Sequence, residues 1–120
     1  LMTGRLGVRT GMYGDKRSVL FPDSPEGLPQ SELTMATLLK QKGYTSACIG
    51  KWHLGHKKES LPLKHGFDYF YGIPYSNDMS KKEQNLMGNN YYNTALPFYQ
   101  QETIIETEPD QALLTKRLTE

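Results

Sequence analysis

Apolar side chains recur at helical spacing in the first half of the chain. Three of them stand at positions i, i+3 and i+4, which places them on one face of a helix: Met35, Leu38 and Leu39. Ser31 can cap the N-terminus of such a helix, and Gly43 can take the left-handed position that ends it. The pattern therefore predicts a helix over residues 31–42.

Short runs without charge predict strands. Residues 44–49 (Tyr-Thr-Ser-Ala-Cys-Ile) are closed by Gly50, which is typical of a buried strand. Between residues 51 and 96 the chain is rich in Gly, Pro, Asn and Ser, and we expect long functional loops there with one further strand at 67–73. Residues 97–100 and 103–106 predict a small hairpin, and helical spacing resumes over residues 110–119.

A helix, a glycine turn and a strand make half of an α/β unit, so the pattern predicts the α/β class. Residues 1–17 are rich in glycine, which predicts a loop, and three prolines in residues 21–30 predict an extended connection. The 120 residues begin with Leu1 and end inside a predicted helix. We therefore expect a fragment of one larger domain.

Composition narrows the functional classes. Hydrophobic residues make up 37% and the mean hydropathy is -0.64, which fits a partial globular domain with a thin core. The net charge is +1 and no stretch concentrates basic residues, which argues against a nucleic-acid partner. The single Cys48 excludes an internal disulfide framework. No apolar run approaches the roughly 20 residues of a membrane span.

The sharpest candidate for chemistry is residues 50–55, Gly-Lys-Trp-His-Leu-Gly, placed just beyond the predicted strand. In open α/β sheets, ligands bind at the carboxyl ends of the strands. If the chain stays extended there, Lys51 and His53 point to the same side and Trp52 points to the other. A point charge beside an imidazole suits an anionic ester, because the imidazole can donate to or accept from a hydroxyl at near-neutral pH.

Two segments resemble signatures of a known family. Residues 43–44 and 49–55 resemble the second signature of the sulfatase family, of the arylsulfatase type. Residues 1–5, Leu-Met-Thr-Gly-Arg, resemble the tail of its first signature, Cys (or Ser)-x-Pro-x-Arg followed by Leu-Thr-Gly-Arg. Further matches lie at residues 27–29, 63–68 and 72–78. The likeness covers residues 1 to about 78 well and the remainder loosely.

The resemblance implies a partial alkaline-phosphatase-like α/β domain and a sulfuric ester hydrolase that binds calcium. In that family a Cys or Ser becomes formylglycine, the nucleophile, which would lie upstream of Leu1, and the calcium ligands would also lie outside this chain. The implied substrates are sulfate-ester small molecules, sulfated sugars or glycolipids. The implied compartments are secreted, periplasmic or lysosomal.

Three residues take site roles from the resemblance. Lys51 resembles a lysine that contacts both sulfate and formylglycine, and His53 resembles a histidine that hydrogen-bonds the formylglycine hydroxyl. Ser76 resembles a serine that reaches the substrate sulfate. Arg5 matches an arginine that supports the nucleophile helix. No metal ligand is assigned to this chain, and the sequence leaves the oligomeric state open.

The remaining reactive side chains have structural interpretations. We expect Cys48 to be a buried thiol, His56 to be exposed and His65 to be structural, and no zinc-ligand spacing is present. We expect Tyr91 and Tyr92 to serve in packing.

Two alternatives to a sulfatase remain open. One is a phosphatase or phosphodiesterase of the same superfamily, since a lysine and a histidine serve phosphorus as readily as sulfur. The other is a non-catalytic polypeptide without activity alone.

Overall fold

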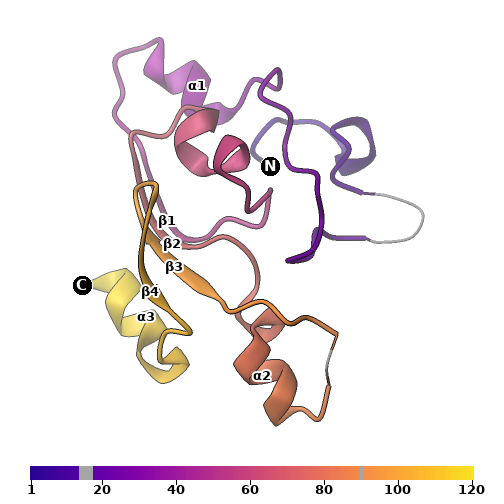
Figure 1. Ribbon diagram of the computed structural model, residues 1–120. Helices are drawn as coiled ribbons and strands as arrows, with labels where there is room; N and C mark the ends of the chain where they lie inside the picture. Colours follow the sequence, from indigo (N-terminus) through magenta and orange to yellow (C-terminus); the bar gives the residue numbers. More distant parts are fainter. Residues whose placement is uncertain (14–17, 90) are drawn as a thin grey trace.

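A four-stranded mixed sheet forms the centre of the computed structural model, which describes residues 1–13, 18–89 and 91–120 (Figure 1). Its strands, in both chain order and sheet order, are β1 (Ala47–Lys51), β2 (Tyr69–Ile73), β3 (Pro97–Gln100) and β4 (Thr103–Thr107). β1 and β2 run parallel, whereas β2–β3 and β3–β4 are antiparallel. The predicted α/β class is therefore confirmed.

Helices connect and flank these strands. The α-helices are α1 (Met35–Lys40), α2 (Lys81–Leu86) and α3 (Gln111–Thr119). Short 3-10 helices lie in the connections: Gly7–Arg9, Lys58–Ser60, Pro62–His65 and Asn77–Met79. In Figure 1, α1 and α2 lie toward opposite ends of the sheet, and α3 lies beside β4. None of the described helices has the length and apolar content needed to cross a bilayer.

The first predicted helix is shorter than the sequence pattern indicated. Its N-cap is Thr34 rather than Ser31, because the Thr34 hydroxyl accepts a hydrogen bond from the Thr37 N–H at 3.1 Å. The same hydroxyl donates to the carbonyl of His65 at 2.5 Å, which ties the start of α1 to another segment. Gly43 has a φ of +81°, as expected for the residue that ends this turn.

The apolar face of α1 is exposed, unlike that of a helix packed on a core. Ala36 is its buried residue, while Met35 and Leu38 are 49% and 50% exposed. The apolar stripe therefore points away from the sheet of this chain.

The strand predicted at residues 44–49 begins three residues later and includes Lys51. It is an edge strand with alternating half-buried and exposed residues, and Ile49 is 57% exposed. The prediction of a buried strand is therefore wrong for the described chain. The burial pattern follows from the sheet order, because β1 has a neighbour on one side, β2.

The other predicted elements match more closely. The strand predicted at 67–73 is β2, the hairpin is β3 and β4, and the C-terminal helix is α3, capped by the Asp110 side chain. The loop predicted over 51–96 contains α2, whose N-cap Ser80 accepts from the Glu83 N–H. Within the predicted loop at 1–17, residues 14–17 lie outside the described part of the chain.

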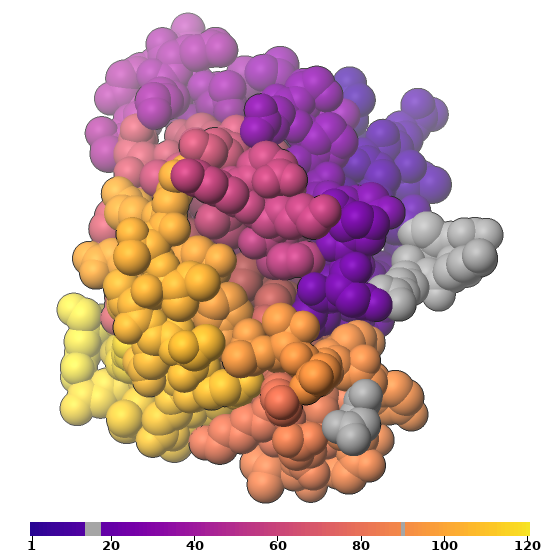
Figure 2. Space-filling view, in the orientation of Figure 1, coloured from indigo at the N-terminus to yellow at the C-terminus, as the bar shows by residue number. Residues whose placement is uncertain are grey.

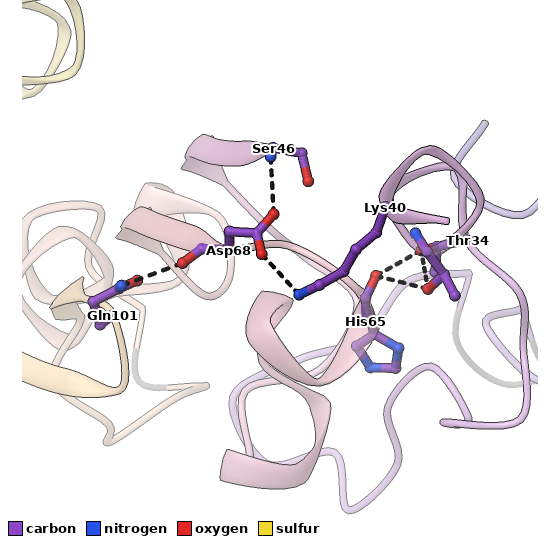
Figure 3. A network of polar contacts seen from close by, with 7 residues as sticks. Thr34, Lys40, Ser46, His65, Asp68 and Gln101 are labelled. Atoms are coloured by element: carbon purple, nitrogen blue, oxygen red, sulfur yellow. Dashed lines mark hydrogen bonds and ion pairs between the residues drawn. The ribbon is translucent and has the colours of Figure 1, made fainter. Parts of the chain in front are cut away.

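A polar network around Asp68 ties α1 to the starts of both parallel strands (Figure 3). The Asp68 carboxylate accepts from Lys40 Nζ at 2.7 Å and from the Ser46 N–H at 3.0 Å. Its backbone carbonyl accepts from Gln101 Nε2 at 3.3 Å, at the tip of the β3–β4 hairpin. The network therefore holds α1, the start of β1, the start of β2 and the tip of the hairpin together.

Among the described residues, two apolar clusters of buried side chains pack against the sheet. One gathers residues of β2, β3 and α3 with the segment after β2: Ile73, Tyr75, Met79, Leu96, Phe98 and Leu114. The other gathers Trp52, Leu61, Phe70 and Tyr99. Trp52 belongs to the predicted site segment, so the second cluster anchors that segment to the sheet.

Candidate functional site

The carboxyl ends of the two parallel strands place residues 51–53 beside residues 73–76. Lys51 is the last residue of β1 and pairs in register with Ile73 of β2. The ladder continues past the strands, because Trp52 N–H donates to the Ile73 carbonyl at 2.9 Å and His53 N–H donates to the Pro74 carbonyl at 3.0 Å. Both candidate segments therefore leave the same edge of the sheet, where ligands bind in open α/β folds.

Lys51 ends in an exposed ammonium. Its side chain has no ion-pair partner among the described residues, whereas several other lysines are paired with carboxylates, as Lys64 is with Glu102 at 2.7 Å. An unpaired ammonium at a strand end is available to an anion. Lys51 therefore keeps its place as a candidate ligand for sulfate oxygens.

His53 does not continue the extended backbone of β1. Its φ is +59°, in the left-handed region that non-glycine residues rarely adopt. The predicted extended backbone at His53 is therefore wrong. Strand alternation consequently cannot be used to place the Lys51 and His53 side chains on one side. The imidazole is half-buried, and its Nε2 lies 2.8 Å from the carbonyl oxygen of Leu20, which comes from the N-terminal segment.

Trp52 anchors the segment between these two residues. It is 6% exposed, and its indole Nε1–H donates to the Ser60 carbonyl at 2.7 Å. Its ring stacks on His65 at 5.6 Å between centroids and meets Phe67 edge-on at 6.0 Å. This packing fixes the backbone from which Lys51 and His53 project.

Ser76 lies two residues beyond the carbonyl that His53 N–H contacts. It is half-buried and precedes the 3-10 helix Asn77–Met79, and its hydroxyl makes no capping bond to that helix. Asn77, in contrast, is engaged with Gln111, to which its Nδ2 donates at 2.6 Å. Along the backbone, Ser76 is thus brought to the same strand edge as Lys51 and His53.

N-terminal residues form one border of this region. In Figure 2 the purple part of the N-terminal segment adjoins both the magenta middle of the chain and the orange segment before β3. Phe21 stacks on Tyr92 at 5.2 Å with ring planes 19° apart. Tyr92 therefore packs as expected, whereas its neighbour Tyr91 is 76% exposed.

The other candidate side chains are placed outside a reactive cluster. Cys48 is half-buried rather than buried, and desolvation raises its pKa to about 11, which keeps the thiol protonated. His65 is buried at 2% exposure, and burial lowers its pKa. His56 is half-buried against Tyr75 rather than exposed, and desolvation is the main cause of its lowered pKa. Arg5 pairs with Glu32 at 3.1 Å on the surface.

A metal site is not formed by these residues. Within residues 1–13, 18–89 and 91–120, no group of three or more His, Cys, Asp or Glu side chains is arranged to hold a metal ion. The calcium that the resemblance implies therefore has no candidate ligand set in the described chain.

Comparison with known proteins defines the class. The profile of the family described as Sulfatase matches residues 1–119. The chain is 37% identical over 139 aligned positions to arylsulfatase G of Mus musculus, covering 100% of this chain and 26% of that protein. It is 52% identical over 84 positions to human steryl-sulfatase, covering 63% of this chain and 14% of that protein. The chain thus spans about a quarter of arylsulfatase G.

Solved structures agree with this likeness. The chain superimposes with a TM-score of 0.61 and 28% identity on the PsFucS1 sulfatase from Pseudoalteromonas sp., over 98% of this chain and 27% of that chain. It matches Ps i-CgsB, solved in complex with k-i-k-neocarrahexaose, with a TM-score of 0.61 and 27% identity, over 97% of this chain and 27% of that one. The α/β sheet is therefore part of an alkaline-phosphatase-like domain. The chain belongs to the sulfatase family.

One contact at the site had no signal in the sequence. The Leu20 carbonyl approaches His53 from a segment 33 positions away, and a backbone acceptor leaves no trace in residue type. Gly72, opposite Gly50 in the ladder, could have been noticed as a glycine inside a predicted strand.

Proposed function

We propose that the full-length protein that contains this chain hydrolyses sulfate monoesters. The observation that carries the proposal is the placement of Lys51, His53 and the Ser76 segment at one carboxyl edge of parallel strands, in a member of the sulfatase family. The nucleophile is proposed to be a formylglycine upstream of Leu1, and residues 1–120 are proposed to be one part of a single catalytic domain. Calcium is proposed to bind through residues outside this chain.

The residues of this chain would bind and position the ester. The exposed Lys51 ammonium supplies positive charge to the sulfate oxygens, where charge stabilisation lowers the barrier. His53 exchanges a hydrogen bond or proton with a hydroxyl in the site. The Ser76 hydroxyl, which is not used in capping, donates to a sulfate oxygen. Formylglycine, when present, supplies the attacking hydroxyl.

The proposed substrates are aryl sulfates, sulfated sugars or sulfated glycolipids. The names of relatives support the aryl and sugar classes, since these relatives include an arylsulfatase and a protein solved with a neocarrahexaose. A chain of 120 residues without the nucleophile is expected to show no turnover alone, because binding groups without a nucleophile give little rate.

The test is a matched pair of esters given to the full-length protein. We expect nitrocatechol sulfate to be hydrolysed with a kcat/KM at least about tenfold above that for the corresponding phosphate ester. Preference for the phosphate would assign the site to phosphoryl transfer instead. The isolated 120 residues serve as the inactive control, and turnover by them would contradict the requirement for an upstream nucleophile.

A further inference from the structure

The contact between His53 and Leu20 determines which ring nitrogen carries a hydrogen. The partner of His53 Nε2, at 2.8 Å, is a backbone carbonyl oxygen, and a carbonyl oxygen can only accept. The contact is therefore a hydrogen bond in which Nε2–H donates. In a neutral imidazole, one nitrogen donates and the other accepts, so Nδ1 is left with its lone pair.

The backbone of His53 is held as tightly as its ring. The N–H donates to the Pro74 carbonyl at 3.0 Å, and the preceding Trp52 is buried against His65. The left-handed φ of +59° is unfavourable for a residue with a side chain. Such strain persists only where surrounding contacts impose it, and here the Pro74 carbonyl holds the backbone of His53 while the Leu20 carbonyl contacts its ring.

We propose that the Leu20 carbonyl is a positioning group that holds neutral His53 as the Nε2–H tautomer, and that Nδ1 is the atom that serves the reaction. This inference rests on the proposed function and assigns an atom to it. Nδ1 accepts the hydrogen bond of a hydroxyl in the site. When the hydroxyl proton moves to Nδ1, the oxygen keeps the electron pair and the ring becomes an imidazolium.

The Leu20 carbonyl remains bonded to Nε2–H after that transfer. A hydrogen bond to an ionised donor is about twice as strong as one between neutral groups. The carbonyl thus keeps the ring in place at the stage when Nδ1 holds the proton. It acts as an orienting partner for the imidazole, the role that a carboxylate has in other hydrolases.

The tautomer is measured directly by long-range proton–nitrogen NMR on the full-length protein labelled at histidine. The His53 signals are assigned by their loss in His53→Gln. We expect a protonated Nε2 and an unprotonated Nδ1 at a pH where the ring is neutral. A protonated Nδ1, or an equal mixture of the two tautomers, would overturn the inference. Leu20→Ala keeps the carbonyl and is expected to leave the signals unchanged.

Two substitutions separate the nitrogens by activity. The Asn side chain places an acceptor near the position of Nδ1, whereas Gln places its amide near Nε2. We expect both variants to lose activity and His53→Asn to retain a kcat about tenfold above that of His53→Gln. The reverse order, with both variants folded by their thermal transitions, would place the reaction at Nε2.

Failure of the inference differs from failure of the proposed function. An active enzyme with a protonated Nδ1 would overturn the assignment of the atom and keep the hydrolase. A wild-type protein inactive on sulfate and phosphate esters would overturn the proposed function and with it the role of Nδ1.

Discussion

Gly72 lies opposite Gly50 in the parallel ladder between β1 and β2, and the backbone of Gly50 leaves no room for a side chain at Gly72. A Cβ added to Gly72 would overlap the carbonyl oxygen of Gly50. The pair stands one residue before Lys51 and Ile73, so the close approach of the two backbones sets the spacing of the strand ends. The spacing of the strand ends at the candidate site therefore depends on Gly72, a residue without a side chain.

Gly72→Ala is therefore expected to destabilise the protein by about 3 kcal/mol, because the neighbouring strand backbone must move. The measurement is urea unfolding of the full-length protein. Gly7→Ala is the control, since a Cβ there meets its nearest neighbour at an ordinary 3.5 Å. Equal midpoints for the two variants would mean that the strands separate without cost.

Lys51→Ala is expected to lower kcat/KM for an aryl sulfate by about a hundredfold or more, because the sulfate loses a facing positive charge. Lys42→Ala removes an exposed lysine near the end of α1 and is expected to leave activity unchanged. A similar loss in both variants would indicate an effect of net charge rather than of the site.

Asp68→Asn is expected to lower the thermal midpoint by a few degrees at pH 7. The hydrogen bond from Lys40 and then that from the Ser46 N–H hold the Asp68 pKa below its usual value. Its stabilisation is thus present above the unfolded pKa of about 3.9 and is lost as the pH falls through the folded pKa. Midpoints of wild type and variant should converge in acid. A difference that persists below that pKa would contradict the assignment to the ionised carboxylate.

His65 is also expected to make the folded protein less stable in acid, but through a side chain that is neutral, not charged, in the folded state. Burial lowers its pKa, so the folded state holds the neutral ring while the unfolded chain takes up a proton below about pH 6.5. Stability is complete above that pH and falls as the pH drops toward the folded pKa. His65→Phe should flatten this slope in urea unfolding measured from pH 7 to 5. An unchanged slope would assign the acid sensitivity to other groups.

The sequence predicted the elements whose signals are local. Gly43 has the expected left-handed conformation in the turn after α1, and the Gln101-Glu102 turn lies between two strands. The start of α1 moved to Thr34 because a hydrogen bond to the His65 carbonyl, 31 positions away, favours that cap. Capping preferences depend on residues close in the sequence, so they give no information about a partner that is distant along the chain.

At the candidate site, the strand edge was predicted correctly, and the backbone conformation at His53 was not. Lys51, His53 and the segment of Ser76 do leave one strand edge, as the order of strand and motif indicated. The left-handed His53 and its Leu20 partner could not be foreseen, because tertiary contacts impose a backbone conformation that histidine does not favour alone. The exposure of Ile49 was also not predicted, because it depends on β1 being an edge strand of the described sheet.

Turnover of nitrocatechol sulfate by the full-length protein, compared with its Lys51→Ala and His53→Ala variants, tests the central claim most directly. If the Lys51 ammonium and the His53 imidazole act on one sulfate ester, each variant is expected to lose at least about a hundredfold in kcat. The thermal midpoint of each variant is expected to stay within a few degrees of the wild-type value. Wild-type turnover in both variants would contradict the claim and place the chemistry elsewhere in the protein.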